Sequence, residues 1–127
     1  MLKIIEWDEE GYPTEESLQK LSEVLNSLDF MKAKEAFYDA LKENIYRDAC
    51  GRTQVEVRGK TMDVWEYHTY GWAGNEAIIR TLYESSVWGL FFQRHDAGGH
   101  YYFTLPEHTL SITTTGGSSE QRSDFGN

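Results

Sequence analysis

The strongest fold signal in this chain of 127 residues is the run Thr53-Gln54-Val55-Glu56-Val57-Arg58-Gly59-Lys60. Side chains alternate along its first six residues with the period of a β-strand. Its last two residues fit a tight turn, and residues 62–69 predict the returning strand. We therefore expect an antiparallel hairpin that places Trp65 and Tyr67 on one face and Glu66 and His68 on the other.

Two helices are predicted upstream of the hairpin. Thr14 fits an N-cap and is followed at helical spacing by the apolar residues Leu18, Leu21, Leu25 and Leu28. Asp29 fits the N-cap of the second helix, which is expected to end near residues 49–51 with Gly51 at the C′ position. The buried face of this second helix would consist of Phe30, Ala33, Phe37, Ala40, Leu41 and Ile45.

Downstream of the hairpin the pattern predicts a helix over residues 75–86 and a strongly apolar strand over residues 87–94. Residues 95–99 fit a turn, and residues 100–105 are expected to pair back before Pro106 ends the strand. The predicted fold is α+β: two N-terminal helices followed by a β-β-α-β-β unit, with an antiparallel sheet and the helices on one face.

The domain organisation follows from length and composition. We expect one domain over residues 1–112, with a helical part at 1–51 and the β-β-α-β-β unit at 52–106. Residues 113–127 are rich in Thr, Gly and Ser and are predicted to form a flexible tail.

Composition excludes several classes of protein. The single cysteine excludes an internal disulfide framework. The net charge of −9 argues against direct nucleic-acid binding, which requires a basic footprint. No stretch is long and apolar enough to cross a membrane, and no apolar signal segment follows Met1, so a cytoplasmic location is expected. The sequence leaves the oligomeric state open, homo-oligomers included.

A candidate site begins at the glycine-punctuated run Tyr70-Gly71-Trp72-Ala73-Gly74-Asn75-Glu76. A turn of this kind ahead of a helix presents free N–H groups to an anion, with Asn75 as N-cap and Arg80 in the following turns. Glu76 opposes this interpretation because its carboxylate would repel an anion unless it is paired. Glu76 and Arg80, four residues apart, could pair with each other on the helix surface.

Histidines and aromatic rings extend this candidate site. Across the predicted 95–99 turn, His95 and His100 would come close, and His68 on the neighbouring hairpin could join them. They could act as an acid–base pair oriented by Glu66 or Asp96. No tight metal-ligand spacing and no nucleophile motif occurs, so no metal, cofactor or catalytic residue is predicted. The predicted ligand-binding set is Tyr70, Trp72, Asn75, Glu76, Arg80, His95, His100 and Tyr102.

Acidic residues are dense near the N-terminus. A solvated surface is one interpretation of this density. The other is a phosphate-mimicking face that occupies the nucleic-acid groove of a partner protein. The residues assigned to that face are Glu9, Glu10, Glu15 and Glu16.

The chain also resembles a small uncharacterised family met in phages and bacterial genomes. The resemblance covers about residues 62–105 and rests on Trp65, the core at 71–76, Trp88 and the turn Gly98-Gly99-His100-Tyr101. Family members carry a similar Gly-Trp-Ser-Gly-Asn-Glu core, whereas this chain has Ala73 in place of the serine and Tyr70 in place of a preceding glycine. The resemblance implies a phage or prophage protein in a bacterial host, a setting in which small acidic proteins block host enzymes or sequester ligands.

The sequence therefore predicts a small, soluble, non-catalytic binding protein. Its partner would be a small anionic or planar ligand, such as a nucleotide-like signal, or a host defence protein that it blocks. One alternative is an acidic nucleic-acid mimic of the anti-CRISPR or anti-restriction type, which inhibits a DNA- or RNA-handling protein. The other is a small hydrolase that uses His100 with Glu76 or His95.

Overall fold

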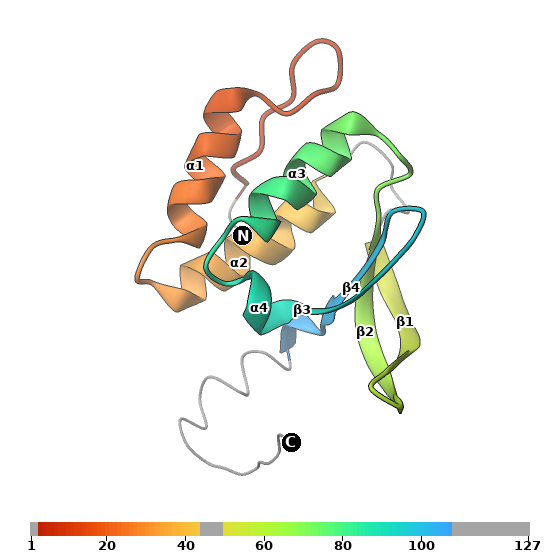
Figure 1. The fold of residues 1–127 in the computed structure, drawn as a ribbon. Helices are drawn as coiled ribbons and strands as arrows, with labels where there is room; N and C mark the ends of the chain where they lie inside the picture. The colour runs from red at the N-terminus through yellow and green to blue at the C-terminus, as the bar shows by residue number, and fades with distance from the viewer. Residues whose placement is uncertain (1–2, 44–49, 108–127) are drawn as a thin grey trace.

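The structure, a computed structural model, describes residues 3–43 and 50–107. Its helices are α1 (Glu15–Leu25), α2 (Phe30–Lys42), α3 (Ala73–Tyr83) and the short α4 (Trp88–Phe91). Its strands are β1 (Cys50–Val57), β2 (Lys60–His68), β3 (Phe92–Asp96) and β4 (His100–Thr104), and they form an antiparallel sheet in the order β1-β2-β4-β3. Figure 1 shows α1, α2 and α3 gathered on one side of the sheet. The predicted α+β class, with two helices ahead of the sheet, is confirmed.

Both N-terminal helices begin where the capping residues predict. The Thr14 side chain accepts a hydrogen bond from the Ser17 amide at 3.2 Å, and Asp29 accepts one from the Lys32 amide at 3.1 Å. Each bond satisfies an amide that the first turn of a helix leaves without an internal partner.

The predicted end of α2 is wrong. The helix ends at Lys42, and Cys50 and Gly51 open β1, where Gly51 pairs with Glu66. The ladder between β1 and β2 runs without a break from Cys50 to Val57. Cys50 and Gly51, which were expected at the helix end because of the glycine, are therefore paired in the sheet. Ile45, predicted on the buried face of this helix, lies outside the described residues.

The hairpin is confirmed, with its turn one residue earlier than predicted. Arg58 and Gly59 occupy the turn, with φ of 50° and 81°, and Val57 pairs with Lys60. Two successive positive φ values define the type I′ geometry, whose twist matches that of the flanking strands.

The apolar stretch after α3 divides into two elements. Residues 87–94 were predicted as one strand, but Trp88–Phe91 form the helical turn α4 and only Phe92 onward enters β3. The turn directs Phe91, which is fully buried, toward the rings of α2. Burial of this large ring accounts for the interruption of the strand. The sequence did not indicate it, because apolar content alone does not distinguish a strand from a buried helical turn.

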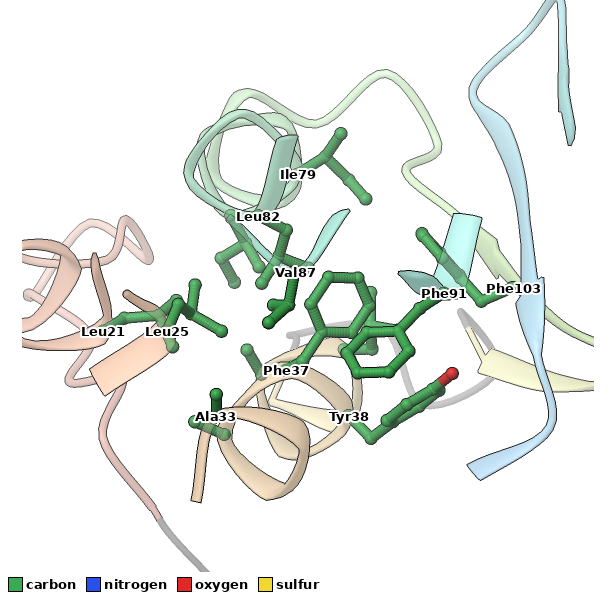
Figure 2. Close-up of a cluster of buried hydrophobic side chains, with 14 of the residues drawn as sticks. Leu21, Leu25, Ala33, Phe37, Tyr38, Ile79, Leu82, Val87, Phe91 and Phe103 are labelled. Carbon is green, nitrogen blue, oxygen red and sulfur yellow. The ribbon is translucent and has the colours of Figure 1, made fainter. Parts of the chain in front are cut away.

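The main core lies between the helices and one face of the sheet (Figure 2). Phe37 of α2 lies at its centre, with ring centroids 4.9 Å from Phe91 and 5.3 Å from Phe103. Leu21 and Leu25 of α1 are fully buried in the same cluster. The cluster draws on both the helical part and the β-β-α-β-β unit, so the described residues share one core. The predicted tail at 113–127 lies outside them.

We call the opposite face of the sheet the outer face. The sheet is curled, so that its edge strands approach each other. β1 and β3 are the two edge strands, yet Arg94 of β3 donates from Nη1 to the Glu56 carbonyl of β1 at 2.6 Å. In a flat sheet these strands would be about 14 Å apart, which exceeds the reach of an arginine. The curl accounts for the burial of Val64 and Tyr102 on this face, outside the main core.

Candidate functional site

The two glycine turns are joined at Thr69. Its amide donates to the Gly99 carbonyl at 2.9 Å, and its carbonyl accepts the Trp72 amide at 3.1 Å. Its hydroxyl accepts the Gly71 amide at 3.2 Å. Gly99 has φ +87°, and a Cβ there would lie 2.3 Å from the Thr69 hydroxyl oxygen. Only glycine fits this contact, so the 98–99 turn is locked against the entrance to α3.

Trp72 and Asn75 support this turn rather than line a cavity. Trp72 occupies the N-cap position of α3 without a side-chain cap, which corrects the prediction that Asn75 would cap the helix. The Trp72 ring stacks on Tyr12 with centroids 5.1 Å apart. Asn75 is fully buried, and its amide donates to the Thr69 carbonyl at 3.3 Å.

Three of the predicted site residues converge on one cavity of about 450 Å³ between α3, α4 and the β3–β4 hairpin. We call it the α3–β4 cleft. Glu76 and Arg80 contribute polar groups from α3, and His95 contributes an imidazole from β3. The remaining lining residues, mostly large and apolar, are Ile79, Tyr83, Trp88, Phe92 and Tyr101. The volume lies within the range of small-ligand pockets, about 300–1,000 Å³.

Aromatic rings hold the walls of the α3–β4 cleft in fixed orientations. The His95 ring stacks on Tyr101 at 4.2 Å, and Trp88 stacks on Phe92 at 4.8 Å. Tyr83 meets the Trp88 ring edge to face at 5.4 Å and is 63% exposed. Such walls offer flat apolar surfaces to a planar ligand.

The charges in the α3–β4 cleft are one carboxylate and one guanidinium. Glu76 accepts a hydrogen bond from the Thr69 hydroxyl at 3.3 Å. Burial and the nearby Glu76 charge raise the pKa of Tyr101. Within the described residues Arg80 forms no ion pair or side-chain hydrogen bond, so it does not pair with Glu76. The Thr69 bond to Glu76 thus leaves the guanidinium open to an anion.

The other predicted ligand-binding residues lie outside the α3–β4 cleft. His100 and Tyr102 are on the outer face, because they pair with His68 and Glu66 of β2. Tyr70 is half exposed and stacks on His68, with centroids 4.0 Å apart. The predicted set of eight residues is therefore divided between the cleft, the turn and the outer face.

His95 and His100 do not come together as predicted. His95 pairs across the hairpin with Tyr101, and His100 pairs with Asp96. The two histidines therefore have opposite parity on the sheet, and their side chains point to opposite faces. The partners of His100 are instead Glu66, at 2.8 Å from Nδ1, and the His68 ring, at 4.0 Å between centroids.

The outer face carries a connected polar cluster. It includes the His100–Glu66 pair and the ion pair between Arg94 and Asp96 at 2.7 Å. The bond from Arg94 holds the pKa of Asp96 below its ordinary value. His68 accepts the Tyr70 amide at Nδ1, at 2.9 Å. The sequence indicated Glu66 and Asp96 as orienting groups. The alternation of side chains along the strands is the signal that could have separated this cluster from the α3–β4 cleft.

Thr69 is the site residue that the sequence reasoning missed. It contacts the Gly99 turn, the start of α3 and Glu76. A threonine at the end of a strand is common, and its only local signal is the glycine two residues later.

Metal binding and the Cys50 thiol are the two other kinds of chemistry to consider. Among the described residues, no three His, Cys, Asp or Glu side chains are placed to hold a metal ion. Burial raises the pKa of the Cys50 thiol to about 12, so the thiol stays protonated and is a poor nucleophile at neutral pH.

The acidic residues form a separate surface. Glu9, Glu10, Glu15 and Glu16 are all exposed. Glu15 and Glu16 border a shallow hollow of about 930 Å³ along α1 and α3, and Glu9 and Glu10 do not. The other acidic residues of that hollow are Glu6, Glu23 and Glu84.

Comparisons with family models, curated proteins and solved structures find no match to this chain. Within residues 3–43 and 50–107, no helix has the length and apolar character required to cross a membrane. Fold and site together describe a small α+β protein with an aromatic cleft and a separate cluster of polar side chains on its outer face.

Proposed function

We propose that this protein is a binding module that holds a small planar ligand with an anionic group in the α3–β4 cleft. The observation that carries the proposal is the combination of fixed aromatic walls with the unpaired Arg80 guanidinium. A nucleotide has this chemistry: its base stacks on aromatic rings, and its phosphate pairs with arginine.

Glu76 adds a means of selection to this cleft. Its carboxylate accepts hydrogen bonds, so it suits an exocyclic amino group on the ring of the ligand. Arg80 lies one turn further along α3, so both groups face the same space. The preferred ligand is therefore an amino-substituted ring that carries one anionic group.

The resemblance to the phage and bacterial family supplies a biological setting for this proposal. In the cytoplasm of a bacterial host, a module of this kind would sequester a nucleotide-like signal or block the host defence protein that uses it. It would act by binding and sequestering the ligand, without catalysis at the cleft.

Isothermal titration calorimetry with AMP, GMP, CMP and UMP tests the proposal. We expect binding, with AMP, GMP and CMP favoured over UMP because their bases carry an exocyclic amino group that can donate to Glu76. Absence of heat with all four at about 1 mM would contradict it. Arg80→Gln should weaken binding at least about tenfold, since it removes a charge-assisted hydrogen bond. Arg52→Gln, an exposed arginine on β1, is the matched control.

Tyr83 tests the aromatic wall separately. Tyr83→Ala should weaken AMP by about five- to tenfold, because stacking on one ring contributes about 1–3 kcal/mol and Tyr83 covers only one side. The side chain is largely exposed, so the variant should remain folded. Equal affinity of wild type and Tyr83→Ala would place the ligand elsewhere.

A second candidate function is inhibition of a DNA- or RNA-handling protein by the acidic surface. The observation that favours it is the excess of carboxylates in the hollow along α1 and α3, which five glutamates and one lysine line. Reversal of Glu15 and Glu16 to lysine should abolish such inhibition, and high salt should weaken the complex. Unchanged inhibition after both reversals would exclude this surface.

The hydrolase alternative takes a different form on the outer face. The partner of His100 there is Glu66, one of the two carboxylates predicted to orient it, whereas Glu76 and His95 line the α3–β4 cleft. Turnover of a chromogenic ester that is lost in His100→Ala and retained in His95→Ala would support it. Equal turnover by both variants would exclude His100 as the general base.

A further inference from the structure

The backbone fixes the tautomer of the neutral His68 ring. Its Nδ1 accepts the Tyr70 amide at 2.9 Å, so in the neutral ring the proton is on Nε2. An imidazolium ion carries a proton on both nitrogens and cannot accept this bond. Protonation of His68 therefore breaks its contact with Tyr70.

The Tyr70 bond maintains an unusual turn. Tyr70 has φ 58° and Gly71 has φ 68°, and for tyrosine this left-handed region is unfavourable. The neutral His68 ring compensates in two ways, by accepting the Tyr70 amide and by stacking on the Tyr70 ring. When the bond is lost, the turn loses the contact that favours its strained geometry.

Thr69 connects this turn to the α3–β4 cleft. It lies between His68 and Tyr70, and its hydroxyl bonds to both Gly71 and Glu76. If the turn relaxes, the hydroxyl no longer holds the Glu76 carboxylate. Glu76 is then free to pair with Arg80, four residues along α3.

We propose that His68 is a proton sensor for the α3–β4 cleft: its protonation releases the 69–71 turn, lets Glu76 neutralise Arg80, and so weakens the binding of an anionic ligand. The proposal rests on the proposed function for its ligand, whereas its structural part, from His68 to Glu76, holds without a ligand.

The charged and titratable groups around His68 come from four elements. Glu66 is on the same strand, and His100 faces it from β4. Cys50 and Arg52 of β1 line a small hollow together with His68, and Arg52 is paired with Glu107. Asp96 of β3 lies beyond His100 and is paired with Arg94.

These neighbours place the transition in mildly acidic conditions. Burial is the main cause that lowers the pKa of His68, and the charge of His100 adds to it, while Glu66 partly opposes both. The sensor is therefore neutral at pH 7, with the turn intact. It responds when the pH falls below the ordinary histidine value of 6.5.

The structural part is tested by NMR on the ligand-free protein. The amides of Tyr70, Gly71 and Glu76 should shift between pH 7.5 and 5.0 with the midpoint of the His68 ring. In His68→Asn these shifts should disappear, because the asparagine side-chain oxygen can accept the same amide two residues on and does not titrate. His100→Asn is the control and should retain them. Shifts that persist in His68→Asn, or vanish in His100→Asn, would overturn the assignment.

The functional part is tested by calorimetry with AMP at pH 7.5 and pH 5.5. We expect roughly fivefold weaker binding at pH 5.5, the change that corresponds to about one lost hydrogen bond. His68→Asn should keep only the smaller loss that arises because the AMP phosphate, whose second pKa is about 6, itself gains a proton over this range. Loss of AMP binding at both pH values with the NMR transition intact would contradict the proposed function and leave the sensor standing. An equal pH effect in wild type and His68→Asn would overturn the sensor.

Discussion

On the inner face of the sheet, rings from β3 and β4 pack under α3 and α4 and leave a cleft whose walls are mostly aromatic and apolar. On the outer face, residues of the same strands form ion pairs and imidazole contacts around His68 and His100. The difference shows how one hairpin supplies two environments. His95 and His100 are five residues apart, and strand parity alone sends one to a ligand-sized cleft and the other to a polar cluster.

The largest effect expected from this comparison concerns the packing of the two faces. Phe37→Ala should lower the free energy of unfolding by about 3–5 kcal/mol, because it empties the centre of the main core. Val64→Ala, which is equally buried on the outer face, should cost about 2 kcal/mol. Urea unfolding measures both values. Equal losses would mean that the outer face has a second core of comparable weight.

A smaller effect is expected where the two glycine turns meet. Gly99→Ala should destabilise the protein by about 2 kcal/mol, because its positive φ and the Thr69 contact both disfavour a Cβ. Gly89→Ala is the matched control, since a Cβ on this exposed α4 residue meets no atom within 4 Å. The control should be neutral or slightly stabilising. A neutral Gly99→Ala would show that the turn is not locked.

The smallest effect is the dependence of stability on pH. The pKa of His68 is lowered in the folded protein, so between pH 7.5 and 5.5 the unfolded chain binds its proton more readily. Stability should therefore fall as the pH is lowered through 6.5. His68→Asn should reduce this slope in urea midpoints measured across the range. A slope that is unchanged in this variant would assign the effect to another group.

Local signals in the sequence were sufficient for most of the fold. Thr14 and Asp29 identified the helix starts because an N-cap acts on amides within three residues. The hairpin followed from alternation and a glycine turn. The end of α2 and the break at Trp88–Phe91 could not be predicted, because each depends on a distant partner: β2 for Gly51, and α2 for Phe91.

The candidate site was predicted in part. Glu76, Arg80 and His95 do share a cavity, and the turns that hold Trp72 and Gly99 do meet. Residue type and turn position indicated these groups, but the side of the sheet to which each points depends on register. One residue of difference in register would have exchanged His95 and His100. The ligand, the acidic partner surface and the phage setting remain predictions.

The link between Arg94 and Glu56 has a consequence for self-association. Exposed edge strands can add a strand from another molecule and so begin aggregation. Here the Arg94 side chain of one edge strand is bonded to the backbone of the other, and the polar residues Arg52, Gln54 and Glu56 of β1 are exposed. Both features discourage strand addition at these edges. Recognition of a partner by main-chain pairing at β1 or β3 is thus disfavoured.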